Sequence, residues 1–327
     1  METALHNILE RVRAAAADAT PLRLCGGGSK DFHGLALEGT PLELRPLRGI
    51  ISYEPTELVV TARAGTPLQE LQATLAQAGQ ALAFEPPHFA LGDKQPTVGG
   101  MVATGWSGPA RASSGAVRDF VLGVEIINGR GELLRYGGQV MKNVAGYDVS
   151  RLMAGSWGTL GVITEVSLKV LPVAPAQATL VFAMDEAQAL EALNRWGGQP
   201  LPLNASCWAQ GQLWLRLCGA QAAVQAACQK LGGERLPDDQ AAALWHSLRE
   251  QQHPWFAQRS DADALWRLSL PVSSAPLAVH EPLGAPVPAL HGDPLTAPGL
   301  SISVPAIPPV SASAGAVCGR DTLELSL

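Results

Sequence analysis

The chain has 327 residues, a formal net charge of −6 and 47% hydrophobic residues, which is long enough for two domains with their own cores. An acidic chain without a Lys/Arg run excludes a nucleic-acid-binding surface, since such a surface needs clustered basic residues. Its five cysteines have no C-x-x-C pair and no metal-type spacing, so we expect reduced thiols, no metal site and a cytoplasmic location.

The first 34 residues combine a predicted helix, a strand and a glycine run. Charged and apolar residues alternate at helical spacing over 1–17, which predicts an amphipathic helix rather than a signal peptide. The apolar run 21–25 predicts a strand, and Gly26, Gly27 and Gly28 follow it directly. Successive glycine N–H groups can turn toward an anion, but the spacing fits neither a P-loop nor G-x-G-x-x-G. The run alone is equally consistent with a flexible turn and a phosphate site.

Residues 47–173 alternate β-rich runs with helical patches, which predicts an α+β arrangement. Thr66 is the expected N-cap of a helix with Pro67 at its first position, and Asn128-Gly129 predicts a tight hairpin turn. The expected elements are strands at 57–62, 80–85, 121–127, 132–136 and 162–171 and helices at 68–78 and 148–153.

A second block with its own periodicity follows, and then the composition changes. The block predicts strands at 178–184, 205–210 and 212–218 and helices at 185–196 and 220–231. Ten of the 25 prolines fall between Pro271 and Pro309, a density that disfavours both helix and central strand. We therefore expect an irregular tail that adds no strand to the preceding sheet.

Four stretches taken together resemble a known flavoprotein family. They are GGGSKDFHG, PTVGGMVATGWSG, RDFVLGVEIINGRGE and KNVAGYDVSRLMAGSWGTLGVITEVSLKVLP. In this order they resemble the FAD-binding domain of the vanillyl-alcohol-oxidase or PCMH type, most closely the FAD-binding subunit of bacterial glycolate oxidase, over residues 1–270. The resemblance implies an α+β fold. It has a PCMH-type FAD-binding domain of two α/β subdomains (1–173), a small incomplete α+β cap (174–270) and an irregular Pro-rich tail (271–327), disordered or produced by a shifted reading frame.

The resemblance also implies a non-covalently bound FAD. The first loop would wrap its pyrophosphate with Gly26, Gly27, Gly28, Ser29 and Lys30. The second motif would line the ribityl chain, pyrophosphate and isoalloxazine with Pro96, Thr97, Val98, Gly99, Gly100, Ala103, Thr104 and Gly105. Gly161, Val162 and Ile163 would meet the adenosine end, and Gly115 and Arg118 lie between, with Arg118 shaping the loop.

Single polar residues outside these motifs have alternative interpretations. His33 beside the glycine loop suggests a covalent flavin link, but its offset from the glycines differs from that in covalent relatives, which favours a partly exposed polar residue. Lys142 is interpreted as a loop-tying residue, and Asp148 is a possible helix N-cap. His246 and His253 lack a third ligand nearby, so no metal site is expected. The sequence assigns no catalytic residue.

The function that the resemblance implies is oxidation of glycolate, or a similar short 2-hydroxy acid, to the 2-oxo acid. The implied partners are a catalytic flavoprotein subunit and an iron–sulfur subunit. The chain would contact the inner membrane only through these partners. Catalytic relatives have G-S-E-G-T where this chain has Trp157 in the third position, and their H-x-G-D-G-N-x-H motif is echoed only by His291-Gly292-Asp293-Pro294. We therefore expect activity to require partners. The alternatives are a non-catalytic flavin-binding assembly subunit and, third, a UDP-sugar reductase of the same fold.

Overall fold

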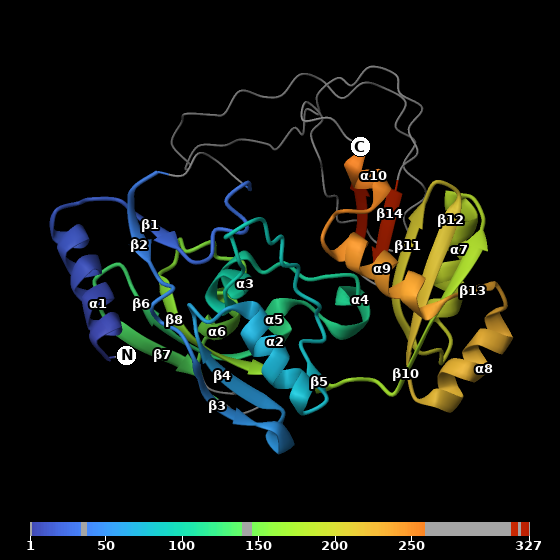
Figure 1. Ribbon diagram of the computed structural model, residues 1–327, viewed down its shortest axis with the longest axis horizontal. Helices are drawn as coiled ribbons and strands as arrows, with labels where there is room; N and C mark the ends of the chain where they lie inside the picture. Colours follow the sequence, from blue (N-terminus) through green and yellow to red (C-terminus); the bar gives the residue numbers. More distant parts are fainter. Residues whose placement is uncertain (1, 34–37, 139–145, 259–314, 320–321, 327) are drawn as a thin grey trace.

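The computed structural model describes residues 2–33, 38–138, 146–258, 315–319 and 322–326. Two halves lie beside each other, each built on its own antiparallel sheet, and among the described residues the chain passes from the first half to the second near residue 174 (Figure 1). The mixed α+β fold expected from the sequence is confirmed. Within the described residues, no helix is both long and apolar enough to span a membrane.

The first half contains a five-stranded sheet in the order β3-β4-β8-β6-β7. Its strands are β3 (Ile50–Glu54), β4 (Val59–Arg63), β6 (Val121–Ile127), β7 (Leu133–Gly137) and β8 (Val162–Lys169). A 3₁₀ turn (Pro55–Glu57) joins β3 to β4, and the short strands β5 (Gln80–Ala81) and β9 (Leu171–Pro172) pair separately. The largest hydrophobic core lies between this sheet and the helices α2 (Leu68–Gln77) and α3 (Val98–Thr104).

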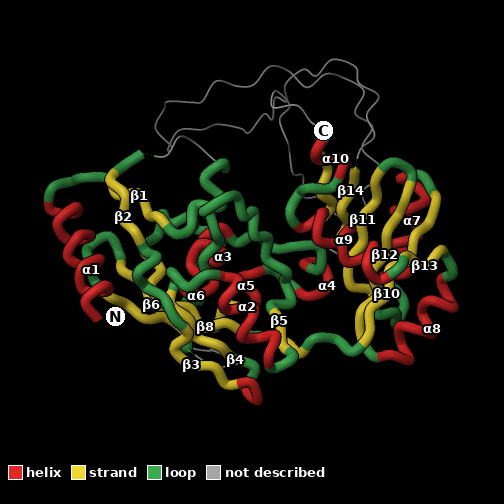
Figure 2. The backbone as a smooth tube through the Cα atoms, in the orientation of Figure 1, coloured by secondary structure: helices red, strands yellow, loops and turns green. Residues whose placement is uncertain are grey.

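A second layer lies at the N-terminal edge of this half (Figure 2). Helix α1 (Glu2–Ala17) packs with the parallel pair β1 (Leu22–Cys25) and β2 (Thr40–Glu43). Ile8 and Val12 on α1 share a buried cluster with Ile127 of β6 and Val162 of β8, which joins the layer to the sheet. Three short helices, α4 (Arg111–Ser114), α5 (Val117–Phe120) and α6 (Val149–Leu152), complete this half.

The second half contains a sheet in the order β13-β10-β12-β11-β14-β15. Its first four strands in the chain are β10 (Ala176–Ala183), β11 (Leu203–Ala209), β12 (Gln212–Gly219) and β13 (Glu234–Leu236). Helices α7 (Glu186–Gly197) and α8 (Gln221–Leu231) pack on one face, while α9 (Asp238–Arg249) packs on the other and is followed by α10 (Pro254–Ala257). In Figure 1, α9 and α10 lie on the side of this sheet that faces the first half.

A buried ion pair links the two halves. Arg216 Nη2 on β12 lies 2.8 Å from Glu85 Oε2, and the Arg216 Nε donates to Asn204 Oδ1 at 2.6 Å. Only 5% of the Arg216 side chain and 28% of the Glu85 side chain are exposed. Near them, Ser113 Oγ donates to the Asn204 carbonyl at 2.6 Å. The segment that follows strand β5 is therefore fixed against the second sheet.

Several element predictions are confirmed, and three differ in an informative way. The apolar run 121–127 is β6, and the helices predicted at 68–78 and 185–196 are α2 and α7 within two residues at each end. Thr66 is not the N-cap of α2, because Pro67 takes that position and the Thr66 hydroxyl instead bonds Gly49. The turn after β6 is longer than two residues, since the Asn128 side chain accepts the N–H groups of Arg130 and Glu132. Strand 80–85 is limited to Gln80–Ala81.

At the end of the tail the structure differs from the expectation of a segment without strands. Strands β14 (Gly315–Gly319) and β15 (Thr322–Ser326) form a hairpin at the edge of the second sheet, with Ala316 opposite Trp208. This stretch contains no proline, so its backbone N–H groups can take part in the sheet ladder. The proline-rich part of the tail lies outside the described residues.

Candidate cofactor-binding pocket

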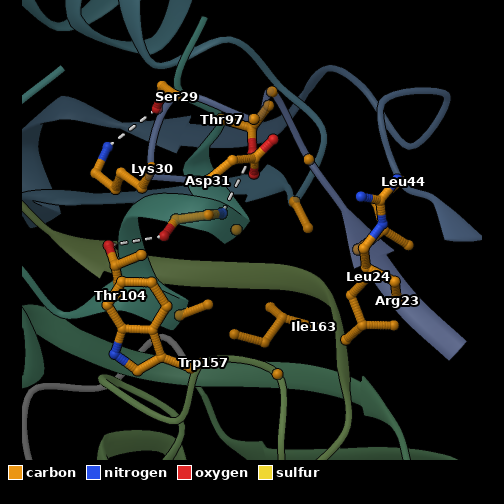
Figure 3. A pocket seen from close by; sticks show the side chains of 18 of the residues that line it. Arg23, Leu24, Ser29, Lys30, Asp31, Leu44, Thr97, Thr104, Trp157 and Ile163 are labelled. Carbon is orange, nitrogen blue, oxygen red and sulfur yellow. Dashed lines mark hydrogen bonds between the residues drawn. The ribbon is translucent and has the colours of Figure 1, made fainter. Parts of the chain in front are cut away.

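One pocket of the first half has a volume of about 440 Å³. Three segments form its walls: the loop after β1, one side of α3 with the residues before it, and the turn at 157–161. Figure 3 shows Arg23, Leu24 and Leu44 toward one end and Lys30, Thr104 and Trp157 toward the other. The first end is lined mainly by leucines, whereas the second carries a cation, hydroxyls and an indole. An elongated ligand with one apolar and one polar end fits this shape.

The loop after β1 presents free main-chain donors. Parallel pairing with β2 ends at Cys25, so the glycines leave the sheet at this point. The backbone N–H groups of residues 26–30 have no hydrogen-bond partner among the residues that the structure describes. The Nε of Arg23, which lies on β1 and also lines the pocket, is likewise buried without a partner in that part of the chain. Such a set of donors fits a diphosphate.

Glycine is required in this loop by a close backbone approach. A Cβ on Gly27 would lie 1.4 Å from the Gln95 carbonyl oxygen, and a Cβ on Gly26 would lie 2.8 Å from Thr97 Oγ1. Gly28 is the one member of the run with a left-handed φ, at +70°. The loop after β1 is thus packed directly on the residues that precede α3, and the two glycine motifs form one wall.

Helix α3 contributes its side to the pocket rather than its N-terminal amides. Thr97 is the N-cap and its Oγ1 accepts the Gly100 N–H at 3.2 Å, as expected for this residue type. The N–H groups of Val98 and Gly99 donate to the carbonyls of Thr66 and Ala64. A Cβ on Gly99 would lie 2.6 Å from the Ala64 Cβ, so glycine here allows the helix to pack on the end of β4. A Cβ on Gly100 would meet only Thr97 Oγ1, at 3.1 Å.

An aromatic cluster borders the polar end of the pocket. The His33 ring stacks on Trp157 at 4.8 Å between centroids with 23° between planes, and Trp106 lies 5.0 Å from His33 at a steep angle. Phe89 and Phe32 extend the cluster away from the pocket. Trp157 remains 41% exposed and has a φ of +52°, an unfavourable conformation for a bulky residue. Strain of this kind occurs most often at functional sites.

Lys30 is the buried cation of the pocket. Its Nζ donates to Ser29 Oγ at 3.2 Å and to the His88 carbonyl at 3.4 Å, and the residue is 9% exposed. Burial lowers the pKa of this ammonium group to about 8, while the Glu250 carboxylate acts in the opposite direction. Lys30 is thus still mostly protonated near neutral pH, and a bound anion would favour the protonated form further.

Most of the residues that the sequence predicted for FAD line this pocket. They are Gly26, Gly27, Gly28, Ser29, Lys30, Pro96, Thr97, Gly99, Gly100, Ala103, Thr104, Gly161 and Ile163. Five others do not line it. Val98 and Val162 point into hydrophobic cores, and Gly105 ends α3 with a φ of +67°. Gly115 ends α4, and Arg118 is exposed beside Asp119.

Other lining residues were not among the predicted FAD contacts, because the resemblance assigned none of them to the cofactor. They are Leu22, Arg23, Leu24, Asp31, His33, Glu38, Leu44, Ala64, Trp157, Gly158 and Thr159. The leucines belong to β1 and the turn after β2, so only the parallel pairing of these strands reveals their place. For Trp157 a signal existed, since it replaces an acidic residue of the catalytic relatives.

The remaining polar candidates have structural contacts. Asp148 is the N-cap of α6, with its side chain accepting the Arg151 N–H at 3.1 Å. His253 caps α10 and packs against Trp214. No group of three or more His, Cys, Asp or Glu side chains suited to a metal ion occurs in the described part of the chain. Lys142 and the stretch His291–Pro294 lie outside it.

The fold and the pocket together define an FAD-binding domain of flavoprotein oxidoreductases. Residues 5–137 match the family model described as an FAD binding domain. Alkyldihydroxyacetonephosphate synthase has a similar fold, with a TM-score of 0.57 over 75% of this chain and 56% of that one, at 18% identity.

Curated relatives specify the family. The glycolate oxidase subunit GlcE of Escherichia coli (strain K12) is 50% identical over 270 residues, which cover 83% of this chain and 74% of that protein. The D-lactate dehydrogenase of Anaerostipes hadrus and the glycolate oxidase subunit GlcD of Bacillus subtilis (strain 168) are 33% and 31% identical, and the matched regions cover only 31% and 32% of those proteins. The chain belongs to the family of the glycolate oxidase subunit GlcE and binds FAD.

Proposed function

We propose that this chain is the FAD-binding subunit of an oxidoreductase complex that oxidises glycolate, or a similar short 2-hydroxy acid, to the 2-oxo acid. The observation that carries the proposal is the 50% identity to GlcE, which extends through both halves of the molecule. Two further relatives are named for D-lactate and D-2-hydroxyglutarate, which are also 2-hydroxy acids. A flavin in such a complex would accept the two electrons that leave the substrate's hydroxyl-bearing carbon, and the FAD of this chain would take part in that electron transfer.

The residues of the pocket have distinct parts in holding this cofactor. The unpartnered N–H groups of the loop 26–30 and the Lys30 ammonium group bind the diphosphate. The small residues Gly100 and Ala103 let the extended chain of the cofactor lie against α3, and Thr104 adds a hydroxyl at the polar end. The leucines of the opposite end exclude water around the adenine.

The flavin is held non-covalently in this proposal. His33 is the histidine of the described lining, and its ring is packed between Trp106 and Trp157. Acid precipitation of the purified protein should release a yellow supernatant that contains FAD. A coloured pellet would contradict non-covalent binding, and FMN in the supernatant would contradict the assignment of the loop 26–30 to a diphosphate.

Partners complete the proposed enzyme. We assign to them a second, catalytic flavoprotein and an iron–sulfur protein that carries electrons onward. The complex is placed in the cytoplasm, with contact to the inner membrane only through these partners. The support is that GlcE and GlcD are both named as subunits of glycolate oxidase.

Reconstitution tests the proposal. The isolated chain should reduce a dye negligibly with glycolate, and co-expression with the two partners should restore the reaction. Full turnover by the chain alone would contradict the need for partners. Failure of the whole complex to oxidise any short 2-hydroxy acid would overturn the proposed function.

A variant with a blocked pocket distinguishes two roles for this chain, that of a redox subunit and that of a non-catalytic assembly subunit. Gly100→Leu places a side chain in the pocket without a backbone clash, because only Thr97 Oγ1 lies near the added Cβ. The matched control is Gly197→Leu, another helical glycine, whose added Cβ meets nothing within 4 Å. If the complex with Gly100→Leu assembles without this FAD yet keeps its turnover, the assembly role is correct.

A further inference from the structure

A carboxylate of the second half holds a segment that contacts the pocket residue Lys30. Glu250 directly follows α9 and is 7% exposed. It accepts the backbone N–H of His88 at 3.0 Å, that of Phe89 at 2.8 Å and the Arg249 Nε at 2.7 Å. His88 and Phe89 belong to the first half, so these bonds cross between the two sheets.

The segment that Glu250 holds is in direct contact with Lys30. The His88 carbonyl accepts from Lys30 Nζ at 3.4 Å, and the same nitrogen lies 5.6 Å from the centroid of the Phe89 ring. Phe89 has a φ of +48°, which costs energy for an aromatic residue and persists only where surrounding contacts hold it. The two amide bonds to Glu250 are contacts of that kind.

We propose that Glu250 is a positioning residue for cofactor binding, which holds the turn at residues 88–89 and keeps Lys30 in the FAD pocket as an ammonium group. The inference rests on FAD occupying this pocket and adds a role for the second half. Glu250, which follows a helix of the second half, thereby maintains the positive charge of Lys30, and Lys30 binds the diphosphate in the first half.

The charges around Lys30 support this role. Besides Glu250, the titratable and charged groups of the neighbouring elements are Asp31, His33, His88, Lys94, His246 and Arg249. Burial alone would raise the pKa of Glu250. The pKa is nevertheless held below its usual value by the Phe89 N–H, the Arg249 guanidinium and the His88 N–H. Burial lowers the pKa of His88, so its ring is neutral at neutral pH. Asp31 is paired with Lys94 at 3.4 Å.

Loss of the Glu250 charge should therefore change when Lys30 loses its proton. With Glu250→Gln, an acceptor oxygen remains for the Phe89 N–H, but the negative charge that favours the ammonium form is gone. Burial then acts unopposed, and Lys30 becomes neutral at a lower pH. The affinity for FAD should fall at the same pH, because a hydrogen bond from an ammonium group to a phosphate is stronger than one from a neutral amine.

The experiment measures the dissociation constant of FAD from pH 6 to pH 9 with the full chain. For the natural chain we expect affinity to weaken by about tenfold as Lys30 deprotonates. For Glu250→Gln the same loss should occur at lower pH, with similar affinities at pH 6. Lys30→Met should bind weakly with a flat profile. The control is Glu85→Gln, which removes another carboxylate bridge between the halves but does not act on Lys30; its profile should keep the natural inflection.

A double variant distinguishes the proposed role from a merely structural one. In a Lys30→Arg background the cation stays protonated at every pH used, so adding Glu250→Gln should no longer move the profile. An equal loss of affinity at every pH in Glu250→Gln, with an unmoved inflection, would overturn the proposal, as would a profile identical to that of the natural chain. If the natural chain itself binds no FAD, the assignment of the pocket fails instead.

Discussion

Replacing Gly27 by alanine should damage both the pocket and the fold, although its backbone φ is not left-handed. The added Cβ would lie 1.4 Å from the Gln95 carbonyl oxygen. The loop and the residues before α3 must separate by roughly 1.6 Å to reach the 3.0 Å that real Cβ contacts require. Neither wall is a flexible side chain, so the main chain has to move.

The magnitude follows from the cost of overpacking a closely packed site. Such changes cost about 1–3 kcal/mol of folding free energy, or a fall in Tm of roughly 2–10 °C for a chain of this size. Movement of the loop also displaces N–H donors from the phosphates, so FAD affinity should fall by about tenfold or more. The assays are thermal unfolding of the FAD-free protein and titration with FAD.

Two other glycine-to-alanine variants serve as controls, and both should cost less stability than Gly27→Ala. Gly28 has a φ of +70°, but a Cβ there would meet only the flexible side chains of Asp31 and Lys94, so Gly28→Ala should cost about 1 kcal/mol. Gly129→Ala meets nothing within 4 Å and should be neutral. A Gly27→Ala protein with the Tm and FAD affinity of the Gly129→Ala protein would refute the reasoning.

Three further predictions concern the ion pair, Lys30 and Trp157. Arg216→Met removes the ion-pair partner of Glu85 and should lower the free energy of unfolding by about 2–3 kcal/mol in denaturant titrations. The cost is smaller than for a fully buried pair because the Glu85 side chain is 28% exposed. Adding Glu85→Gln should recover part of the lost stability. The Lys30 pKa of about 8 lies below its ordinary value of 10.5, so the unfolded chain binds more protons between these values. Stability of the FAD-free protein should thus rise with pH in that window in thermal melts, and this rise should vanish in Lys30→Met. Trp157→Phe should increase the fluorescence of bound flavin, since indoles in contact with a flavin quench it, whereas Trp255→Phe should leave it unchanged.

The sequence alone determined the features that depend on neighbours along the chain. The apolar run 121–127 could only be a buried strand, and Asp185 followed by Gln188 forms the capping box that starts α7. The resemblance to FAD-binding proteins, and with it the expectation of a dinucleotide, could be read from the four motifs because their residue types and order are properties of the sequence. Most of the predicted pocket residues line the cavity for that reason.

Only the tertiary structure decided which distant groups meet. Gly27 must be glycine because of Gln95, and Thr66 bonds Gly49 instead of capping its own helix. Glu250 lies more than 160 residues from the turn that it holds. No periodicity or propensity encodes such contacts, because they arise when segments far apart in the chain pack together and bury polar groups that must then find partners among one another.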